Sequence, residues 1–499
     1  MKRGTQFLLL LAVAAAFAGA VACGASSTSS AGAPKADDDQ SPDDDSADDD
    51  QSPVPAKIES AGQWYIADEY GRALFLHGCN VTDDTGEWSW TPAWGAVSQA
   101  DFESMAELGF NFVRLQRFWG SLEPTEGQYD EAYFDRAQEL LDICQNLGIR
   151  VVLDNHQDTY SPATGGRGAP QWAVRMAPYH YTSLNLGFLG FLGNIEPAVL
   201  QSWQSFWDDA DLQQRYIAML QEYARRFGNH PAVIGYDLLN EPFQGWELLR
   251  VQEWEATVLT STYQKWIDAI REVDQRNWIF YEGVSWIVNG SFLPSHVGPM
   301  KEDKAVYFPH MYDFLVSSNL PWNGDPAFIY TWEGRALDRA AVQQAPLMCG
   351  EFGMNPDIAG QNAYLWQSLQ MFNRSLSGWA YWEWGYVSQH LAAEDQKPSY
   401  KTYIDELAQP YPRAIAGAPL AIRLARDPAT LEIEFLPDPR VAAPTEIFIS
   451  SKRWFPNGFV VTSTDPDGAW SYTYDQAHDV LSVTGDRHAA WTQITVAPK

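Results

Sequence analysis

Eight short apolar runs alternate with helical segments between residues 76 and 384, and this alternation constrains the fold more than any other feature. A continuous apolar run is typical of a strand that is buried on both faces, as in a parallel sheet. The expected strands are Leu76–Val81, Phe110–Leu115, Arg150–His156, Ala232–Leu239, Trp278–Glu282, Ala305–Phe308, Ala345–Glu351 and Gly378–Trp384. Eight β/α units in about 350 residues predict an α/β fold, a (β/α)8 TIM barrel.

The segments between the runs carry helix signals. Helices are expected at residues 98–109, Tyr133–Leu147, Tyr216–Phe227 and Trp254–Val273. A glycine closes each of the first three, at Gly109, Gly148 and Gly228, which is typical of a helix C-terminus. Before the first barrel strand, Trp64–Ile66 and Ala73–Leu76 predict a hairpin around Tyr70-Gly71.

Polar or aromatic side chains stand where several of these strands end. They are Arg114, His156, Asn240, Glu241, His310, Tyr312, Glu351 and Trp382. In a (β/α)8 barrel the carboxyl ends of all strands meet at one face, and catalytic groups gather there. We therefore expect these residues to converge on one site.

Two glutamates form the centre of that expected site. Glu241 lies in Asn240-Glu241-Pro242, where the proline prevents further ladder pairing, and Glu351 lies in Cys349-Gly350-Glu351-Phe352-Gly353. Retaining glycoside hydrolysis needs two carboxyl groups ~5–5.5 Å apart, one as nucleophile and one as acid/base. The pattern predicts Glu351 as nucleophile and Glu241 as acid/base. Glu282, at the end of the fifth strand, is the main alternative nucleophile.

The other strand-end residues are expected to serve this pair and a sugar. Arg114 would hold the nucleophile ionised, and Tyr312 would hydrogen-bond to it. His310 would orient the acid/base, Asn240 would bond to a sugar hydroxyl, and Trp382 would form the floor on which the sugar stacks.

With these motifs the chain resembles family five of the retaining glycoside hydrolases, and most closely the endoglycoceramidases. The subfamily resemblance rests on longer segments. These are Asn155–Tyr160, Gly165–Pro170, Asn229–Asp237, Tyr411–Pro419 and Ala443–Ile449.

The resemblance implies cleavage of the bond between an oligosaccharide and ceramide. It also implies that His156 and Asp158 contact the sugar nearest the lipid. In the family, a Lys after the first strand helps to bind sugar, whereas Asn80–Asp84 contains no Lys. The resemblance therefore does not predict which glycan headgroup is preferred.

The N-terminus predicts export. Met1-Lys2-Arg3 followed by an apolar run predicts a lipoprotein-type signal peptide at residues 1–22, and Ala20–Gly24 resembles a lipobox with Cys23 as the lipidated residue. Ordinary cleavage to a soluble secreted protein is the alternative. Residues 23–57 contain three Asp-Asp-Asp runs and predict a disordered spacer rather than a calcium site. We expect a surface or membrane lipoprotein.

After the catalytic barrel, assigned to residues 58–408, the pattern changes. Short alternating runs separated by turns predict an antiparallel β-sandwich at residues 409–499. It could bind carbohydrate, but a structural buttress is preferred because Trp454, Trp470 and Trp491 are its only tryptophans.

The net charge of −31 argues against a nucleic-acid partner. We expect a monomer that needs no cofactor. We also expect no metal site, because His156 and His310 stand on different strands without a third ligand. Cys79, Cys144 and Cys349 are expected to be buried free thiols.

An apolar segment at residues 184–193 follows the third strand. It carries leucine and phenylalanine side chains, including Phe188 and Phe191, with three interspersed glycines. We expect a flap at the barrel mouth that contacts ceramide, and a buried plug is the alternative.

Two other functions compete with glycosphingolipid cleavage. One is hydrolysis of a β-glucan or mannan by an enzyme of the same family. The other is non-catalytic binding of surface glycans.

Overall fold

The computed structural model of the protein describes residues 56–83, 96–182, 193–384 and 398–499. Three predictions fall outside these ranges: the signal peptide with Cys23, nearly all of the acidic tether, and the apolar segment apart from Gly193. Among the described residues, no helix combines the length and the hydropathy needed to cross a bilayer.

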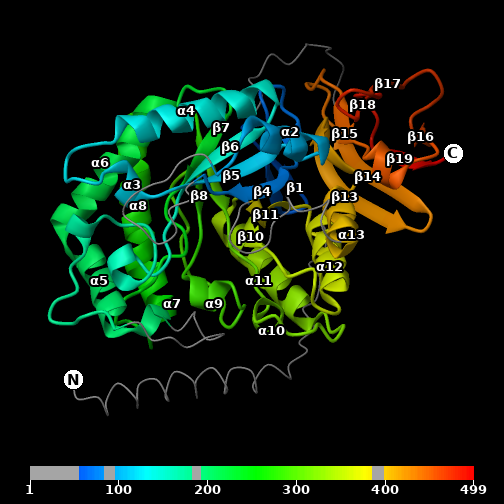
Figure 1. Cartoon of the computed structure of the whole chain (residues 1–499). Helices are drawn as coiled ribbons and strands as arrows, with labels where there is room; N and C mark the ends of the chain where they lie inside the picture. The colour runs from blue at the N-terminus through cyan, green and yellow to red at the C-terminus, as the bar shows by residue number, and fades with distance from the viewer. Residues whose placement is uncertain (1–55, 84–95, 183–192, 385–397) are drawn as a thin grey trace, which may run out of the picture. The chain divides into compact units, whose positions relative to one another are not determined.

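Eight parallel strands form one sheet that closes into a barrel (Figure 1). The strands are β4 (His77–Val81), β5 (Phe112–Arg117), β6 (Arg150–Asn155), β7 (Val233–Asp237), β8 (Trp278–Tyr281), β9 (Ala305–Tyr307), β10 (Met348–Phe352) and β11 (Gly378–Trp384). Their order is β10-β11-β4-β5-β6-β7-β8-β9, and bridges Tyr307–Leu347 and Met311–Phe352 join the two edges. The predicted TIM barrel is confirmed.

The inner face of the barrel changes from apolar to polar along each strand. Phe112, Val152 and Phe280 are fully buried in one apolar cluster, which also contains residues of β9, β10 and β11 and has Ile234 of β7 packed against it. Strand side chains alternate between faces, so Arg114, two residues after Phe112, also points inward. The barrel floor is therefore hydrophobic, and the polar residues stand above it at the carboxyl ends.

Helices surround this sheet. The longer ones are α2 (Gln99–Glu107), α4 (Glu131–Asn146), α5 (Pro197–Asp208), α6 (Ala210–Phe227), α8 (Thr260–Arg271), α11 (Ala327–Gln343), α12 (Gln361–Arg374) and α13 (Pro398–Leu407). A short α7 (Val251–Trp254) and a π-helical turn at Glu255–Leu259 lead directly into α8. The sequence predicted one helix over Trp254–Val273, which begins at the last residue of α7 and does not distinguish the π-helical turn. Figure 1 shows α4, α5, α6 and α8 outside strands β5 to β8.

Two of the predicted helix-closing glycines serve different purposes. Gly109, after α2, has φ +82°, the left-handed conformation that favours glycine. Gly228, after α6, has φ −60° and remains helical. A Cβ at Gly228 would lie 2.5 Å from the carbonyl oxygen of Ala224, so close packing rather than backbone conformation requires glycine there.

The predicted N-terminal hairpin is wrong in its pairing. Strand β2 (Gln63–Ile66) pairs antiparallel with β1 (Lys57–Ser60), which was not among the predicted strands. Strand β3 (Ala73–Leu74) keeps one bridge, Ala67–Ala73, to the β2 side and pairs mainly with the C-terminal domain. The partner strand lies 340 residues later in the sequence, so local pattern could not reveal it.

The C-terminal part forms two antiparallel sheets. Their strands are β12 (Tyr411–Ile415), β13 (Gly417–Arg426), β14 (Ala429–Pro437), β15 (Thr445–Phe448), β16 (Phe459–Ser463), β17 (Ser471–Asp475), β18 (Val480–Thr484) and β19 (Thr492–Pro498). One sheet has the order β17-β18-β15-β12-β3 and the other β13-β14-β19-β16. Ile447 and Leu481 of the first sheet share a buried cluster with Ile433 and Ile494 of the second. The predicted sandwich is confirmed.

The sandwich contacts the barrel through polar and aromatic groups. The Tyr411 hydroxyl donates to the carbonyl of Gly109 at 2.7 Å, and its ring stacks on His77 at 3.9 Å. Trp454 stacks on Trp366 of α12 at 6.2 Å. These are the contacts that a structural buttress would make.

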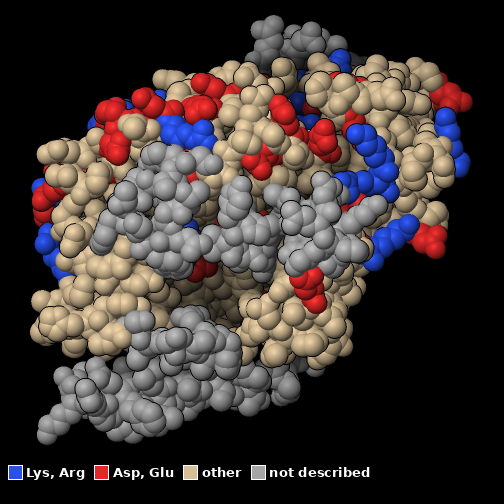
Figure 2. All heavy atoms as spheres, viewed as in Figure 1, with Lys and Arg blue, Asp and Glu red and all other residues tan. Residues whose placement is uncertain are grey.

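The three described cysteines are buried, and acidic side chains are prominent on the surface, in line with the negative net charge. Cys79, Cys144 and Cys349 are buried free thiols, as predicted. Figure 2 shows acidic side chains spread over the upper part of the visible face, with lysine and arginine side chains among them.

Candidate active site

Glu241 and Glu351 meet at the carboxyl ends of the barrel strands. Glu241 follows β7, and Glu351 lies near the end of β10. One carboxylate oxygen of Glu241, one ring nitrogen of His310 and one carboxylate oxygen of Glu351 all lie within 4.8 Å of one another. Inverting glycosidases separate their two carboxyls by ~6.5–9.5 Å and retaining ones by ~5–5.5 Å. One oxygen of Glu241 and one of Glu351 lie within 4.8 Å, which is nearer to the retaining spacing than to the inverting one.

Arg114 links Glu351 to the inner wall of the barrel. Its Nη1 donates to Glu351 Oε1 at 2.7 Å, and its Nη2 donates to Asp237 Oδ2 at 2.7 Å and to Asn240 Oδ1 at 2.9 Å. Asp154 Oδ1 lies 2.9 Å from the same Nη2. Burial by itself would lower the pKa of Arg114, but the surrounding carboxylates raise it, so the guanidinium remains charged. Arg114 lies beside Glu351, as the sequence predicted.

Both oxygens of Glu351 have donors. Arg114 occupies Oε1, and the Tyr312 hydroxyl donates to Oε2 at 2.9 Å. Burial raises the pKa of Glu351 to about 8; Arg114 opposes this rise and the Glu241 carboxylate adds to it. Burial and the neighbouring carboxylate together therefore hold the pKa of Glu351 above its ordinary value, in spite of Arg114.

Glycine is required just before the nucleophile candidate. A Cβ at Gly350 would lie 2.9 Å from the His310 ring and 2.9 Å from the Phe308 carbonyl oxygen. The Gly350 carbonyl in turn accepts a hydrogen bond from Asn80 Nδ2 at 3.0 Å. The Gly350-Glu351 pair in the sequence therefore lets β9 and β10 approach closely enough to bring His310 to the carboxylates.

Glu241 has an unusual backbone and a dense set of partners. Its φ is +45°, which is uncommon for a residue other than glycine and typical of functional sites. Its Oε1 accepts from Asn289 Nδ2 at 2.6 Å and lies 2.9 Å from His310 Nδ1. Its backbone N–H donates to Glu282 Oε1 at 2.7 Å. The predicted contact between His310 and Glu241 is present.

His310 is neutral in this arrangement. Burial lowers its pKa, the hydrogen bond to Glu241 opposes that effect, and the nearby Arg114 charge adds to it. The ring therefore cannot donate through both nitrogens.

Asn240 is held by its neighbours rather than left open. Its Oδ1 accepts from Arg114, and its Nδ2 donates to the Gln157 carbonyl at 2.8 Å. One N–H of the amide is uncommitted by these two bonds and is the group that a sugar hydroxyl could meet.

His156 and Asp158 form an ion-paired chain next to Trp382. His156 Nδ1 lies 2.7 Å from Asp154 and its Nε2 lies 3.5 Å from Asp158, which also pairs with Arg167 at 3.2 Å. Burial would lower the pKa of His156, but the two carboxylates raise it to about 9. The imidazolium ring stacks on half-buried Trp382 at 5.6 Å with 19° between planes. The structure thus brings all of the predicted barrel residues to one face.

Several residues of the site were missed. Asp154 and Asp237 interrupt apolar strands, and a charge inside such a run was a usable signal for them. Asn289 follows the short helix α9 (Ser285–Val288), and no sequence signal pointed to it. Glu383, beside Trp382, is buried, and burial raises its pKa to about 7 against the effect of Arg167.

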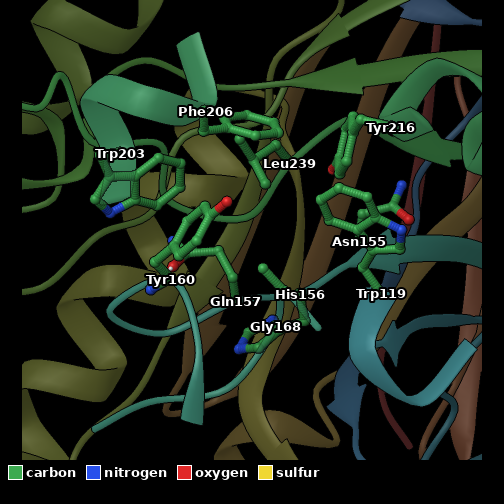
Figure 3. A pocket seen from close by; sticks show the side chains of 11 residues that line it. Trp119, Asn155, His156, Gln157, Tyr160, Gly168, Trp203, Phe206, Tyr216 and Leu239 are labelled. Atoms are coloured by element: carbon green, nitrogen blue, oxygen red, sulfur yellow. Dashed lines mark hydrogen bonds between the residues drawn. The ribbon is translucent and has the colours of Figure 1, made fainter. Parts of the chain in front are cut away.

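A small cavity lies behind the segment that carries His156 and Gln157 (Figure 3). It has a volume of about 20 Å³, and aromatic side chains of Trp119, Tyr160 and Trp203 line much of it. That volume holds about one water molecule and no sugar. The cavity is therefore a small gap in the packing of side chains beside the site, and it is not the substrate cleft.

The donor set of Glu241, His310 and Glu351 could also suit a cation. In this structure the carboxylate oxygens that could bind a cation already have hydrogen-bond partners. Arg114 and Tyr312 donate to Glu351, Asn289 donates to Glu241, and His310 also bonds to Glu241. The guanidinium against Glu351 supplies the positive charge that a metal would bring.

Comparison with known proteins matches two family descriptions to the chain. "Cellulase (glycosyl hydrolase family 5)" matches residues 68–388, and "Glycoside hydrolase family 5 C-terminal domain" matches residues 409–497. Endoglycoceramidase I of Rhodococcus hoagii (strain 103S) is 30% identical over 419 residues, which span 80% of each chain.

Two solved structures of endo-glycoceramidase II from Rhodococcus sp. are also similar. One is a ganglioside GM3 complex with a TM-score of 0.78, and the other is a lactosyl-enzyme intermediate with a TM-score of 0.76. Each is 28% identical and covers 87% of this chain and 99% of its own.

Proposed function

The chain belongs to glycosyl hydrolase family 5, and we propose that it cleaves the β-glycosidic bond between an oligosaccharide and ceramide in glycosphingolipids, with retention of configuration. Membership of this family makes it a glycosyl hydrolase, which is inconsistent with the alternative of a non-catalytic glycan-binding protein. The observation that carries the proposed mechanism is the approach of Glu241 and Glu351 to within 4.8 Å.

The proposed reaction has two steps. In the first, the Glu351 carboxylate attacks the anomeric carbon while Glu241 gives its proton to the ceramide oxygen, and the glycosidic bond breaks. In the second, Glu241 takes a proton from a water molecule that attacks the same carbon, and Glu351 is released as a carboxylate. The proton lost by Glu241 in the first step is thus recovered in the second.

The surrounding groups fit these roles. Arg114 and Tyr312 stabilise negative charge on Glu351 before attack. His310 and Asn289 both contact the same oxygen of Glu241, so they favour its carboxylate form after the proton has left. Trp382 beside the His156 imidazolium provides an aromatic face on which a sugar can stack.

The lipid part of the proposal rests on the relatives. The curated relative and both solved structures are endoglycoceramidases by name, and one of those structures is a complex with a ganglioside. Hydrolysis of a β-glucan remains the second candidate, because the matching family description is that of cellulases.

Product analysis separates these substrates. The protein is incubated with a panel of glycosphingolipids and, in parallel, with soluble β-glucans and mannans, and the products are identified by mass. We expect free ceramide and intact oligosaccharide. Release of glucose oligomers without ceramide would instead assign the protein to polysaccharide hydrolysis.

We also propose that Cys23 is lipidated and that the Asp-rich segment after it is a spacer at the cell surface. Stable membrane attachment takes more than one acyl chain, and bacterial lipoproteins carry two or three. Such an anchor would hold the enzyme at a membrane surface, where a lipid-linked substrate would reside.

A further inference from the structure

Glu282 contacts the acid/base candidate but has no part in the two-step chemistry. Glu282 follows strand β8 (Trp278–Tyr281), and only 1% of its surface is exposed. Its Oε1 accepts the backbone N–H of Glu241 at 2.7 Å and lies 3.4 Å from His310 Nε2. One oxygen therefore accepts the backbone N–H of Glu241 and also lies beside the ring that contacts the Glu241 side chain, without a hydrogen bond to that ring.

The first contact bears on the backbone conformation of Glu241. A residue with φ +45° is held there only when its surroundings favour that conformation. In this conformation the N–H of Glu241 meets Glu282 rather than a strand neighbour. Withdrawal of the acceptor would leave a partly buried backbone N–H without its partner, and relaxation of φ would move the Glu241 carboxyl.

The second contact bears on the ring of His310. Its Nδ1 faces Glu241 Oε1 at 2.9 Å, and its Nε2 faces Glu282 Oε1 at 3.4 Å. The ring is fully buried, with the Trp332 indole N–H donating to the His310 carbonyl at 2.8 Å. Glu282 thus stands at the far end of the ring from the acid/base.

The groups that face Glu282 favour its neutral form. Burial is the largest effect and raises the pKa of Glu282; the carboxylates of Glu241 and Asp237 add to the rise, whereas the Glu241 N–H and Arg114 oppose it. His310 is itself neutral, and burial raises the pKa of Tyr263, Tyr307 and Cys349, which also lie near Glu282, so they add no charge. An uncharged carboxyl can accept the N–H without adding negative charge to the site, and glutamine has the same shape and acceptor.

We propose that Glu282 is a positioning residue for acid catalysis, which fixes the backbone of Glu241 through its acceptor Oε1 and packs beside the ring of His310. This inference rests on the proposed function, in which Glu241 protonates the leaving group. It predicts that acid catalysis by Glu241 needs a hydrogen-bond acceptor at the position of Glu282 Oε1. It also predicts that acid catalysis does not need a negative charge on that residue.

The test measures kcat/KM for a series of aryl β-lactosides whose leaving groups differ in pKa. Good leaving groups depart without a proton, whereas poor ones need general acid catalysis, which contributes ~10²- to 10⁴-fold. Glu282→Gln keeps the acceptor and should retain the wild-type dependence on leaving group. Glu282→Asp withdraws it by one methylene and should lose about 10- to 100-fold on the poorest leaving groups while changing little on the best.

Glu255 provides a matched control. It is another fully buried glutamate that accepts backbone N–H groups, from Val284 at 2.7 Å and His296 at 2.6 Å, and it has no contact with Glu241. Glu255→Asp should lower Tm without altering the dependence on leaving group. Glu282→Ala replaces Glu282→Asp in the same comparison should the latter not fold.

Each outcome decides the proposal. Equal loss by Glu282→Asp at every leaving group, or no loss, overturns it, as does a Glu282→Gln variant that behaves like Glu282→Asp. Glu241→Ala serves as the reference: if its own kcat/KM does not depend more steeply on the leaving group, the acid assignment of Glu241 fails and not the role of Glu282.

Discussion

The hydroxyl of Tyr312 offers the most direct test of how the site sets the charge of Glu351. It donates to Glu351 Oε2 at 2.9 Å, on the opposite oxygen from Arg114. Burial and the Glu351 carboxylate both raise the pKa of Tyr312 well above its usual value, so it remains a donor over the working pH range. Tyr312→Phe removes this one oxygen and leaves the ring in place.

The structure gives the size and sign of the effect. A hydrogen bond to a charged group contributes about 1.5–3 kcal/mol, and one pKa unit corresponds to about 1.4 kcal/mol. Because the lost bond stabilised the carboxylate, the pKa of Glu351, already raised to about 8, should rise by a further one to two units. At pH 7 the ionised fraction, and with it kcat/KM, should fall by about 10- to 100-fold.

The assay is the pH dependence of kcat/KM on a soluble aryl glycoside with a good leaving group. Tyr312→Phe should shift the acidic limb of the profile to higher pH. Tyr216→Phe is the control, because the buried Tyr216 hydroxyl donates to the Leu238 carbonyl at 2.8 Å and touches neither glutamate. An acidic limb that stays in place, or moves equally in both variants, would refute the reasoning.

Three further predictions concern the chemistry and the anchor. Glu351→Gln should abolish turnover, and an activated fluorosugar should label Glu351 in the wild type; label found on Glu282 instead would make the nucleophile assignment wrong. Glu241→Ala should keep activity on substrates with good leaving groups and be rescued by azide, and an equal loss on poor and good leaving groups would count against an acid role. Cys23→Ala should move active enzyme from the membrane to the soluble fraction, whereas an unmodified mature N-terminus by mass spectrometry would disprove lipidation.

Much of the barrel followed from local pattern. Apolar runs of strand length between helical segments gave all eight strands, since a strand covered on both faces has no place for polar side chains along most of its length. The rule that carboxyl ends of barrel strands share one face then predicts that Arg114, Glu241, His310 and Glu351 lie together.

Pairing between distant segments did not follow in the same way. Strand β3 joins β12 of the C-terminal sheet, and β1 takes the place next to β2 that the hairpin prediction gave to β3. A two-residue strand carries almost no pattern, and its partner is chosen by the packing of the two domains. Strand pairing across such distances is a property of the folded chain.

The sequence by itself determined which residue types stand at the strand ends, because hydrophobic periodicity and turn signals are local. It named Glu282 only as an alternative nucleophile. Only the tertiary structure decided that Glu282 faces the backbone of Glu241, that Arg114 has Asp154 and Asp237 as well as Glu351 for partners, and that His156 carries a proton against Trp382. The physical reason is that charge state and hydrogen bonding depend on burial and on neighbours from other strands, which come within a few ångströms only when the barrel closes.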